Sequence, residues 1–323
     1  MAHITRRFLS TTLCRHASAT EACTEMFERF GAGKPISIRK QLIDANQLNL
    51  LSITLNRTPT TGHAPPIGTP VPPGYHLVYF TPSMIESELG LDGTDRTVNP
   101  LSPFTRRMWA GGELRWTQDP NVQLRVGQEV RETTRLLTAE PKTLKSGGEM
   151  LVVGVEKTFE NEKGIALVDK RNWVFQREIA ADNPLKVTEK PEEKALPNGT
   201  YTRDFCQTET TLFRFSALTF NGHKIHYSPE WCRQIEGHRS SVVHGPLNLI
   251  HMLDFWRDTA KSGDTQAVPQ SVTYRAMSPL YVREPYRILL EKDIIRVGQE
   301  GPEWKADICD SYGKISMKAL IVE

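Results

Sequence analysis

The feature that most constrains the fold is a run of strand-like segments joined by short turn signals. The segments cover 113–118, 129–139, 149–160 and 165–177. Turn-forming residues separate them, in Ser146-Gly147-Gly148 and in Asn161-Glu162-Lys163-Gly164. Long strands joined by so few residues predict antiparallel pairing, because parallel neighbours need a long crossover connection.

The second half of the chain repeats this pattern. Strand-like segments occur there at 271–277, 286–297, 303–310 and 314–323. Before each run of strands, apolar residues recur near helical spacing, which predicts helices over 37–55 and 244–259. We also expect strands over 71–80 and 211–218, and loops over 57–74 and 81–103, where proline and glycine gather.

The two halves align loosely. Arg115-Trp116 in the first half corresponds to Arg275-Ala276 in the second, and the closing hairpin at Gly164 corresponds to the one at Gly313. A degenerate internal duplication follows. An apolar helix followed by long antiparallel strands predicts an α+β unit, a helix wrapped by a curved sheet. Two such units can pair their sheets edge to edge and so remove exposed strand edges.

The chain ends and its composition set the domain limits. Residues 1–20 carry three arginines, six Ser or Thr and no acid, which is typical of a mitochondrial transit peptide; an unstructured basic N-terminus is the alternative. We expect an N-terminal unit at 21–180, a linker at 181–200 rich in proline and charge, and a catalytic unit at 201–323.

The net charge of +2 gives no reason to expect nucleic acid as a partner. No apolar stretch is long enough for a membrane span, and five scattered cysteines indicate a reducing compartment.

A dense polar cluster marks the candidate site. Asn221, His223 and His226 lie within six positions, and His244-Gly245-Pro246 follows. Five of the nine histidines fall between 223 and 251. Two structural readings compete with a catalytic one: a pair of hydrogen-bonded histidines, or a zinc site built from His223, His226, His244 and Asp254.

The segment Arg-Phe-Ser-Ala-Leu-Thr-Phe-Asn-Gly-His-Lys-Ile-His-Tyr, followed by Val-Val-His-Gly-Pro-Leu, resembles the MaoC-type hydratase/dehydratase family of the hotdog fold. It is most similar to the tandem-hotdog branch with mesaconyl-CoA hydratases and mitochondrial 3-hydroxyacyl-thioester dehydratases. The N-terminal half resembles that branch weakly, chiefly through residues 106–112. The resemblance implies two tandem hotdog units in one chain, acting as a pseudo-dimer.

The resemblance also implies site residues. His226 matches the family's catalytic histidine, while Asn221 stands where the wider family has its catalytic aspartate. Gly245 matches the glycine whose N–H faces the thioester oxygen, with Pro246 beside it. An amide is no base, so we assign proton transfer to His226 and the orientation of water to Asn221. His223 is either a second proton carrier or the group that fixes the His226 tautomer.

Further residues are candidates for substrate contact. Lys224, Arg233 and Arg239 suit the phosphates of coenzyme A or of a pantetheine arm, and Trp109 suits the acyl groove. The N-terminal half lacks an Asn-x-His-x-x-His motif and is expected to support the substrate without catalysing.

We therefore expect a mitochondrial lyase that adds or removes water across the 2,3 bond of acyl thioesters, with fatty acid synthesis as its setting. Its partners would be acyl-CoA or acyl carrier protein thioesters, without metal or cofactor, and the chain would be a monomeric pseudo-dimer or a homodimer. The alternatives are a CoA-linked hydratase of a short branched diacid such as mesaconyl-CoA, a hotdog thioesterase, and a non-catalytic acyl-thioester-binding protein.

Overall fold

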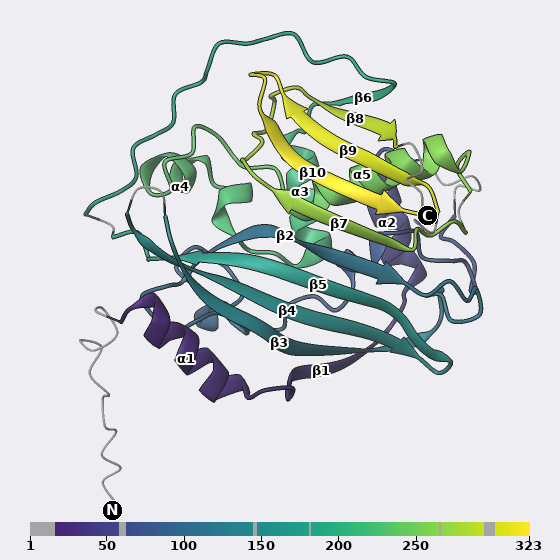
Figure 1. The fold of residues 1–323 in the computed structure, drawn as a ribbon, viewed down its shortest axis with the longest axis horizontal. Helices are drawn as coiled ribbons and strands as arrows, with labels where there is room; N and C mark the ends of the chain where they lie inside the picture. The colour runs from purple at the N-terminus through teal and green to yellow at the C-terminus, as the bar shows by residue number, and fades with distance from the viewer. Residues whose placement is uncertain (1–16, 58–62, 145–146, 181, 265, 294–300) are drawn as a thin grey trace, which may run out of the picture.

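A computed structural model describes residues 17–57, 63–144, 147–180, 182–264, 266–293 and 301–323. In these residues ten strands form one sheet in the order β1-β3-β4-β5-β2-β7-β10-β9-β8-β6. The N-terminal strands lie in the lower part of Figure 1 and the C-terminal strands in the upper part, and the two sets meet at β2 and β7. All neighbours are antiparallel, as the strand pattern predicts.

The two halves have the same strand order, counted outward from the β2–β7 junction. In the N-terminal half these strands are β2 (Arg106–Trp116), β5 (Gly164–Gln176), β4 (Glu149–Asn161), β3 (Glu129–Thr143) and β1 (Pro35–Leu42). In the C-terminal half they are β7 (Ser271–Ala276), β10 (Ile315–Val322), β9 (Glu303–Asp310), β8 (Tyr286–Lys292) and β6 (Tyr201–Phe205). The repeated topology agrees with the loose alignment of the two sequences.

The β2–β7 junction joins the halves edge to edge. Pairing runs from Gly111 opposite Arg275 to Arg115 opposite Ser271, with Glu113 facing Thr273 between them. A Cβ on Gly111 would lie 2.4 Å from the Tyr274 carbonyl oxygen, so the strands can approach only because this residue has no side chain. Each half thus covers the strand edge that the other would expose.

Helix α5 (Gly245–Ala260) is the central element of the C-terminal half. Every residue from Leu247 to Arg257 is buried, and its apolar side chains belong to the main hydrophobic core. That core also takes residues from α2 (Ala45–Thr54) and α3 (Glu209–Thr219), which contact one another. Burial of a large apolar side chain stabilises the fold by about 1.5–3 kcal/mol, so α5 fixes the position of its own N-terminus firmly.

The N-terminal half has no counterpart of α5 among its described residues. Between α2 and β2 the described residues, 55–57 and 63–105, form only two short 3₁₀ turns, η2 (Tyr75–Val78) and η3 (Glu86–Glu88). Helix α1 (Ala19–Phe30) covers part of the inner face of the N-terminal sheet instead. Val153, Val155 and Phe159 are at alternate positions of β4 and so point to that one face. Val153 and Val155 pack in a second core with α1, whereas Phe159 packs in the main core.

Most of the expected strands are present, and so is the helix expected over 244–259. The segment 37–55 is not one helix: its first part is β1, and α2 begins after Asp44, whose carboxylate caps it by accepting the Gln47 N–H at 2.8 Å. The strand expected over 71–80 is instead the turn η2, preceded by Gly74 at φ +85°. The strand expected over 211–218 is helix α3, capped by Thr208.

The expected domain limits stay a prediction, and the structure describes the residues around them as follows. Strand β6 begins at Tyr201, and the linker segment 182–200 contains no helix or longer strand. Residues 1–16 of the expected transit peptide lie outside the described part of the chain. Ser18 and Ala19, which we had also assigned to the leader, belong to the fold: Ser18 forms a capping box with Glu21, and Ala19 is buried against the second core. No helix in the described ranges is long and apolar enough to cross a membrane.

Candidate active site

A cavity of about 1400 Å³ lies where the two halves meet, and both halves line it. The C-terminal half contributes Asn221, His223, His226, His244 and Gly245. The N-terminal half contributes residues 106–110 of β2 and charged residues from the strands behind it, Glu132, Lys157 and Arg171. The expected catalytic residues are therefore gathered at one cavity.

The turn after α3 presents these polar side chains. Phe220 ends the helix in the left-handed conformation at φ 48°, and the Asn221 N–H donates to the Ser216 carbonyl. The Asn221 side-chain oxygen then accepts the His223 N–H at 3.1 Å, which is a local turn that asparagine favours. The short 3₁₀ turn η4 (Lys224–His226) follows and brings His226 back toward the core.

The structure defines the tautomer of His226. Its Nδ1 lies 2.7 Å from the Val242 carbonyl oxygen. A carbonyl only accepts, so Nδ1 carries the proton and the neutral ring has a lone pair on Nε2. The Val242 carbonyl, rather than His223, thus fixes the tautomer. Burial lowers the pKa of His226 to about 4, so the ring is neutral at physiological pH and can accept a proton.

The ring of His244 packs against the ring of His226 and restricts its orientation. The two imidazoles are stacked, with ring centroids 3.6 Å apart and planes 17° from parallel. His244 Nε2 lies 2.9 Å from the Ser216 hydroxyl, and Phe215 contacts its ring edge-on. Burial, and next the neighbouring His226, lower the pKa of His244 well below its usual value. Helix α3 therefore supports His226 through His244.

His223 faces a carboxylate from the other half of the chain. Its buried Nε2 has no hydrogen-bond partner, and the nearest acidic atom is Asp92 Oδ2 at 3.6 Å. The segment carrying Asp92 is attached to the catalytic turn: the Lys224 N–H donates to the Asp92 carbonyl at 2.8 Å. Gly93, at φ +81°, lies so close to Gly222 that a Cβ would be 2.0 Å from the Gly222 carbonyl oxygen.

Gly245 begins helix α5 at the cavity wall, and Pro246 occupies the first turn. The first N–H groups of a helix have no acceptor within the helix, and the helix dipole makes this end positive. Trp109 of β2 lies against Gly245, because a Cβ there would be 3.4 Å from the indole. The expected oxyanion residue and the expected groove tryptophan are therefore neighbours across the junction of the halves.

The three basic residues expected to bind phosphate differ in position. Lys224 lines the cavity, where its Nζ donates to the Leu91 carbonyl at 2.6 Å and lies over the Trp231 ring. Arg233 and Arg239 are not among the described residues that line the cavity. Arg239 forms a bidentate pair with Glu284, and Arg233 donates to the Arg239 carbonyl. The arrangement gives no support to a phosphate role for these two arginines.

Among the described residues, the zinc set considered from the sequence does not bring its ligand atoms together. Asp254 instead accepts from Tyr75 and Arg257. A different trio, Asp92, His223 and Glu236, has its ligand atoms within 4.8 Å of one another. The Arg106 guanidinium donates to Glu236 at 2.6 Å and already supplies positive charge there. We assign no ion to this trio.

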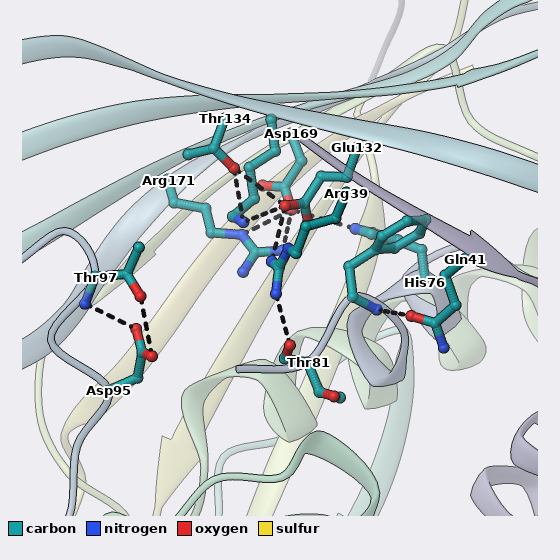
Figure 2. Close-up of polar contacts among 12 residues, drawn as sticks. Arg39, Gln41, His76, Thr81, Asp95, Thr97, Glu132, Thr134, Asp169 and Arg171 are labelled. Carbon is teal, nitrogen blue, oxygen red and sulfur yellow. Dashed lines mark hydrogen bonds and ion pairs between the residues drawn. The ribbon is translucent and has the colours of Figure 1, made fainter. Parts of the chain in front are cut away.

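The N-terminal half contributes charged residues from its strands to the cavity wall. Figure 2 shows Glu132, Asp169 and Arg171 converging with Arg39 beneath the sheet. Arg171 donates to Asp169 through two nitrogens, at 2.7 and 2.5 Å, and His76 lies 3.2 Å from the same carboxylate. Glu132 accepts from Arg39 at 2.8 Å and from Lys157 at 3.1 Å. We call this group, with Lys157 and His76, the charged belt.

Sequence reasoning missed several residues of the site: Asp92, Ser216, Glu236, Arg107 and Arg171. Asp92 precedes a Gly-Thr pair in an expected loop, and nothing in its surroundings in the sequence relates it to His223. Arg171 occurs in a strand as one charge among several. Ser216 lies within the segment 214–227 that carries the main resemblance, and Arg107 lies within the segment 106–112 that carries the weaker one, so these two had a usable signal.

Comparison with known proteins gives consistent results. A family model described as hydroxyacyl-thioester dehydratase type 2 matches residues 74–282. Mesaconyl-C(4)-CoA hydratase of Chloroflexus aurantiacus is 30% identical over 74% of this chain and 82% of its own length. The mitochondrial hydroxyacyl-thioester dehydratase type 2 of Schizosaccharomyces pombe is 25% identical over 69% of this chain and 79% of its own.

Solved structures agree on the fold. A MaoC-like dehydratase from Phytophthora capsici has a TM-score of 0.63 at 13% identity, covering 89% of this chain and 95% of that one. A Mycobacterium tuberculosis protein with a double hotdog fold has a TM-score of 0.51 at 11% identity, covering 88% and 94%. The expectation of two tandem hotdog units is confirmed.

Proposed function

The chain belongs to the hydroxyacyl-thioester dehydratase type 2 family, and from this premise we propose how its cavity performs the reaction. It is a hydro-lyase that reversibly adds or removes water across the 2,3 bond of acyl thioesters. The single observation that carries the mechanism is the neutral His226. Its tautomer is fixed by Val242, and it lines the same cavity as the start of α5.

In the dehydration direction, His226 Nε2 takes a proton from C2 of a 3-hydroxyacyl thioester. The electron pair left on C2 is delocalised onto the thioester oxygen, which accepts the Gly245 N–H at the positive end of α5. The pair then forms the 2,3 double bond, and hydroxide leaves C3 while receiving a proton, so one water is released. Losing a donor to such an oxygen typically costs about 2.7–4 kcal/mol of barrier stabilisation.

The leaving hydroxide, or the attacking water in hydration, is held by Asn221. The Asn221 oxygen is engaged in the turn, so its NH₂ group is the part free to donate. The proton for that oxygen comes from the imidazolium of His226 or through His223. Asp92 is the carboxylate that can orient His223 and stabilise its protonated form, in place of the aspartate that the wider family has at position 221.

The acyl group and carrier define the finer proposal. We place the enzyme in mitochondrial fatty acid synthesis, acting on acyl carrier protein thioesters, because two relatives are named as mitochondrial dehydratases of this type. The relative named mesaconyl-C(4)-CoA hydratase supports a second candidate, a CoA-linked hydratase of a short diacid.

The test is an assay of the purified chain with 2-enoyl and 3-hydroxyacyl thioesters of four to sixteen carbons, on both coenzyme A and acyl carrier protein. We expect water to be added and removed reversibly, with a preference for one carrier. Release of free thiol without hydration would instead indicate a thioesterase. Tight binding with no turnover in either direction would indicate a non-catalytic acyl-binding protein.

A further inference from the structure

Arg107 lies on the wall that the N-terminal half contributes to the cavity. It is opposite Phe175 in the β2–β5 pairing, and Trp109 is opposite Trp173, so Arg107 and both tryptophans share one face of the sheet. The Arg107 guanidinium lies 5.2 Å from the centre of the Trp173 ring. Its charge also acts on His223, whose pKa is lowered first by burial and then by charges including that of Arg107.

Arg107 differs from the other basic residues of this cavity. Each of the others has an acceptor within the described residues: Arg106 bonds Glu236, Lys157 bonds Glu132, Arg171 bonds Asp169 and Lys224 bonds the Leu91 carbonyl. Within the described residues, the Arg107 guanidinium makes no hydrogen bond and no ion pair. Its one close contact of this kind is with the Trp173 ring. It is a cavity-facing guanidinium with five unused donors.

The nearby acids are already engaged. Asp92 and Asp95 raise the pKa of Arg107, whereas burial, the larger influence, lowers it. Asp92 Oδ1 accepts from the Thr94 amide and hydroxyl, and Asp95 accepts from both groups of Thr97, as Figure 2 shows for Asp95. The Arg107 side chain is half-buried, and even partial removal of a guanidinium from water without a hydrogen-bond acceptor is costly. An anionic group bound in the cavity would offset that cost.

We propose that Arg107 is an anion-binding residue of the substrate cavity, taking a carboxylate or phosphate oxygen of the thioester substrate. The fork of a guanidinium matches both groups in bidentate geometry. The Trp173 ring packs against the Arg107 guanidinium, whereas Arg171, on the same wall, is already paired with Asp169. This inference rests on the proposed function, because the anion is part of the same thioester.

Two parts of a substrate could supply the anion: a free carboxylate at the far end of a short acyl group, or a phosphate of the carrier arm. Four substrates separate them. Crotonyl and fumaryl groups differ in that a methyl is replaced by a carboxylate, and each is offered as a thioester of coenzyme A and of N-acetylcysteamine, which has no phosphate. Hydration rates are measured for the full chain and for Arg107→Met.

If the anion is the acyl carboxylate, Arg107→Met lowers kcat/KM for both fumaryl thioesters by about 100-fold more than for the crotonyl thioesters. If it is a carrier phosphate, the variant raises KM for both CoA thioesters by about tenfold relative to their N-acetylcysteamine forms. The proposal is overturned if both ratios stay within about threefold of the parent. Arg131→Met, an exposed arginine paired with Glu160 on the sheet, is the matched control.

Two safeguards keep the result interpretable. If Arg107→Met does not fold, Arg107→Lys is assayed in its place. Lysine keeps the charge but loses the fork, so we expect the same ratio to change by about tenfold, and an unchanged ratio overturns the proposal. A parent enzyme that is inactive with every chain length on both coenzyme A and acyl carrier protein contradicts the proposed function itself, whereas an active parent with unchanged ratios contradicts only the anion site.

Discussion

The two halves of the chain share a strand order but fill the concave face of the sheet differently. The C-terminal half has the sixteen-residue helix α5 with imidazoles gathered at its start, while the N-terminal half has two short 3₁₀ turns and the charged belt. The difference teaches that one topology can serve two purposes. One half lines the cavity with imidazoles held by apolar packing, and the other lines it with charged side chains from its strands.

The largest effect is expected from removing the base. His226→Ala should lower crotonyl-CoA hydration by at least about 10³-fold, because a base in the transition state contributes two to four orders of magnitude. The fold should survive, since its core lies around α5. Hydration rate and thermal unfolding are measured together, with the exposed His63→Ala as control. A His226→Ala enzyme within threefold of the parent would refute the division of labour between the halves.

The next largest effect on activity is expected from changing Asp92, the carboxylate that the N-terminal half places beside His223. Asp92→Asn keeps the size of the side chain and its acceptor for Thr94, but removes the charge beside His223. We expect kcat to fall about 10–100-fold with little change in KM, as is typical when a partner that orients a catalytic group is lost. Asp119→Asn, at another turn, should behave as the parent does. An unchanged kcat would return Asp92 to a purely structural role.

A smaller effect is expected where the two halves are fastened together. Gly93→Ala places a methyl group against the Gly222 carbonyl and also strains a positive φ. Gly263→Ala has a similar φ of +77° with nothing within 4 Å of the added methyl, so it isolates the strain. We expect both variants to lose about 1 kcal/mol of unfolding free energy from strain, and Gly93→Ala to lose more because its methyl group also clashes with the Gly222 backbone. Only Gly93→Ala should also lose activity, about tenfold; equal activity in the two would show that the attachment does not position His223.

The most gradual effect is the response to acid, and it should separate the halves. Burial lowers the pKa of His226 and of His238 to about 4 and that of His251 to about 3, all in the C-terminal half. The unfolded chain therefore binds more protons between pH about 6.5 and 4, and stability falls as pH falls through that window.

The carboxyl of the charged belt responds in the same direction but in a lower pH window, although burial also lowers the pKa of His76 beside it. Burial opposes ionisation of Asp169, but Arg171 and His76 outweigh it, so the pKa of that carboxyl is lowered. Its contribution is present above pH about 4 and is lost only below. Hydrogen exchange between pH 7 and 4 should therefore show protection lost first around α5. Earlier loss in β3–β5 would contradict this assignment.

The same contrast explains what the sequence could predict. The four long strands of the N-terminal half and the helix at 244–259 followed from alternation, turn residues and apolar spacing, since each pattern is contained in its own segment. Three segments were assigned wrongly because a helix cap or a glycine turn, rather than the apolar pattern, determined their structure. Asp44 and Thr208 cap helices that begin inside the expected helix and strand, and Gly74 turns the chain at the expected strand.

The site could be predicted only in part for a related reason. The residues that face the cavity from the C-terminal half lie close together in the sequence, so motif spacing found Asn221, His223, His226 and Gly245. Their supports come from far away: Asp92 from a loop of the other half, and Trp109 from β2. No local pattern encodes such distant pairs, because they meet only through contacts between the two halves, at the β2–β7 junction and between Gly93 and Gly222.

The covalent connection through 182–200 has a consequence for how this site could arise. In an assembly of two identical subunits, any substitution is made twice, so a change that suits one subunit's role must be tolerated in the other's. A single chain carrying both copies is free of that obligation. An arginine in one half and an imidazole in the other can then be selected independently. A symmetric ancestor can in this way give a chain whose two halves carry different site residues.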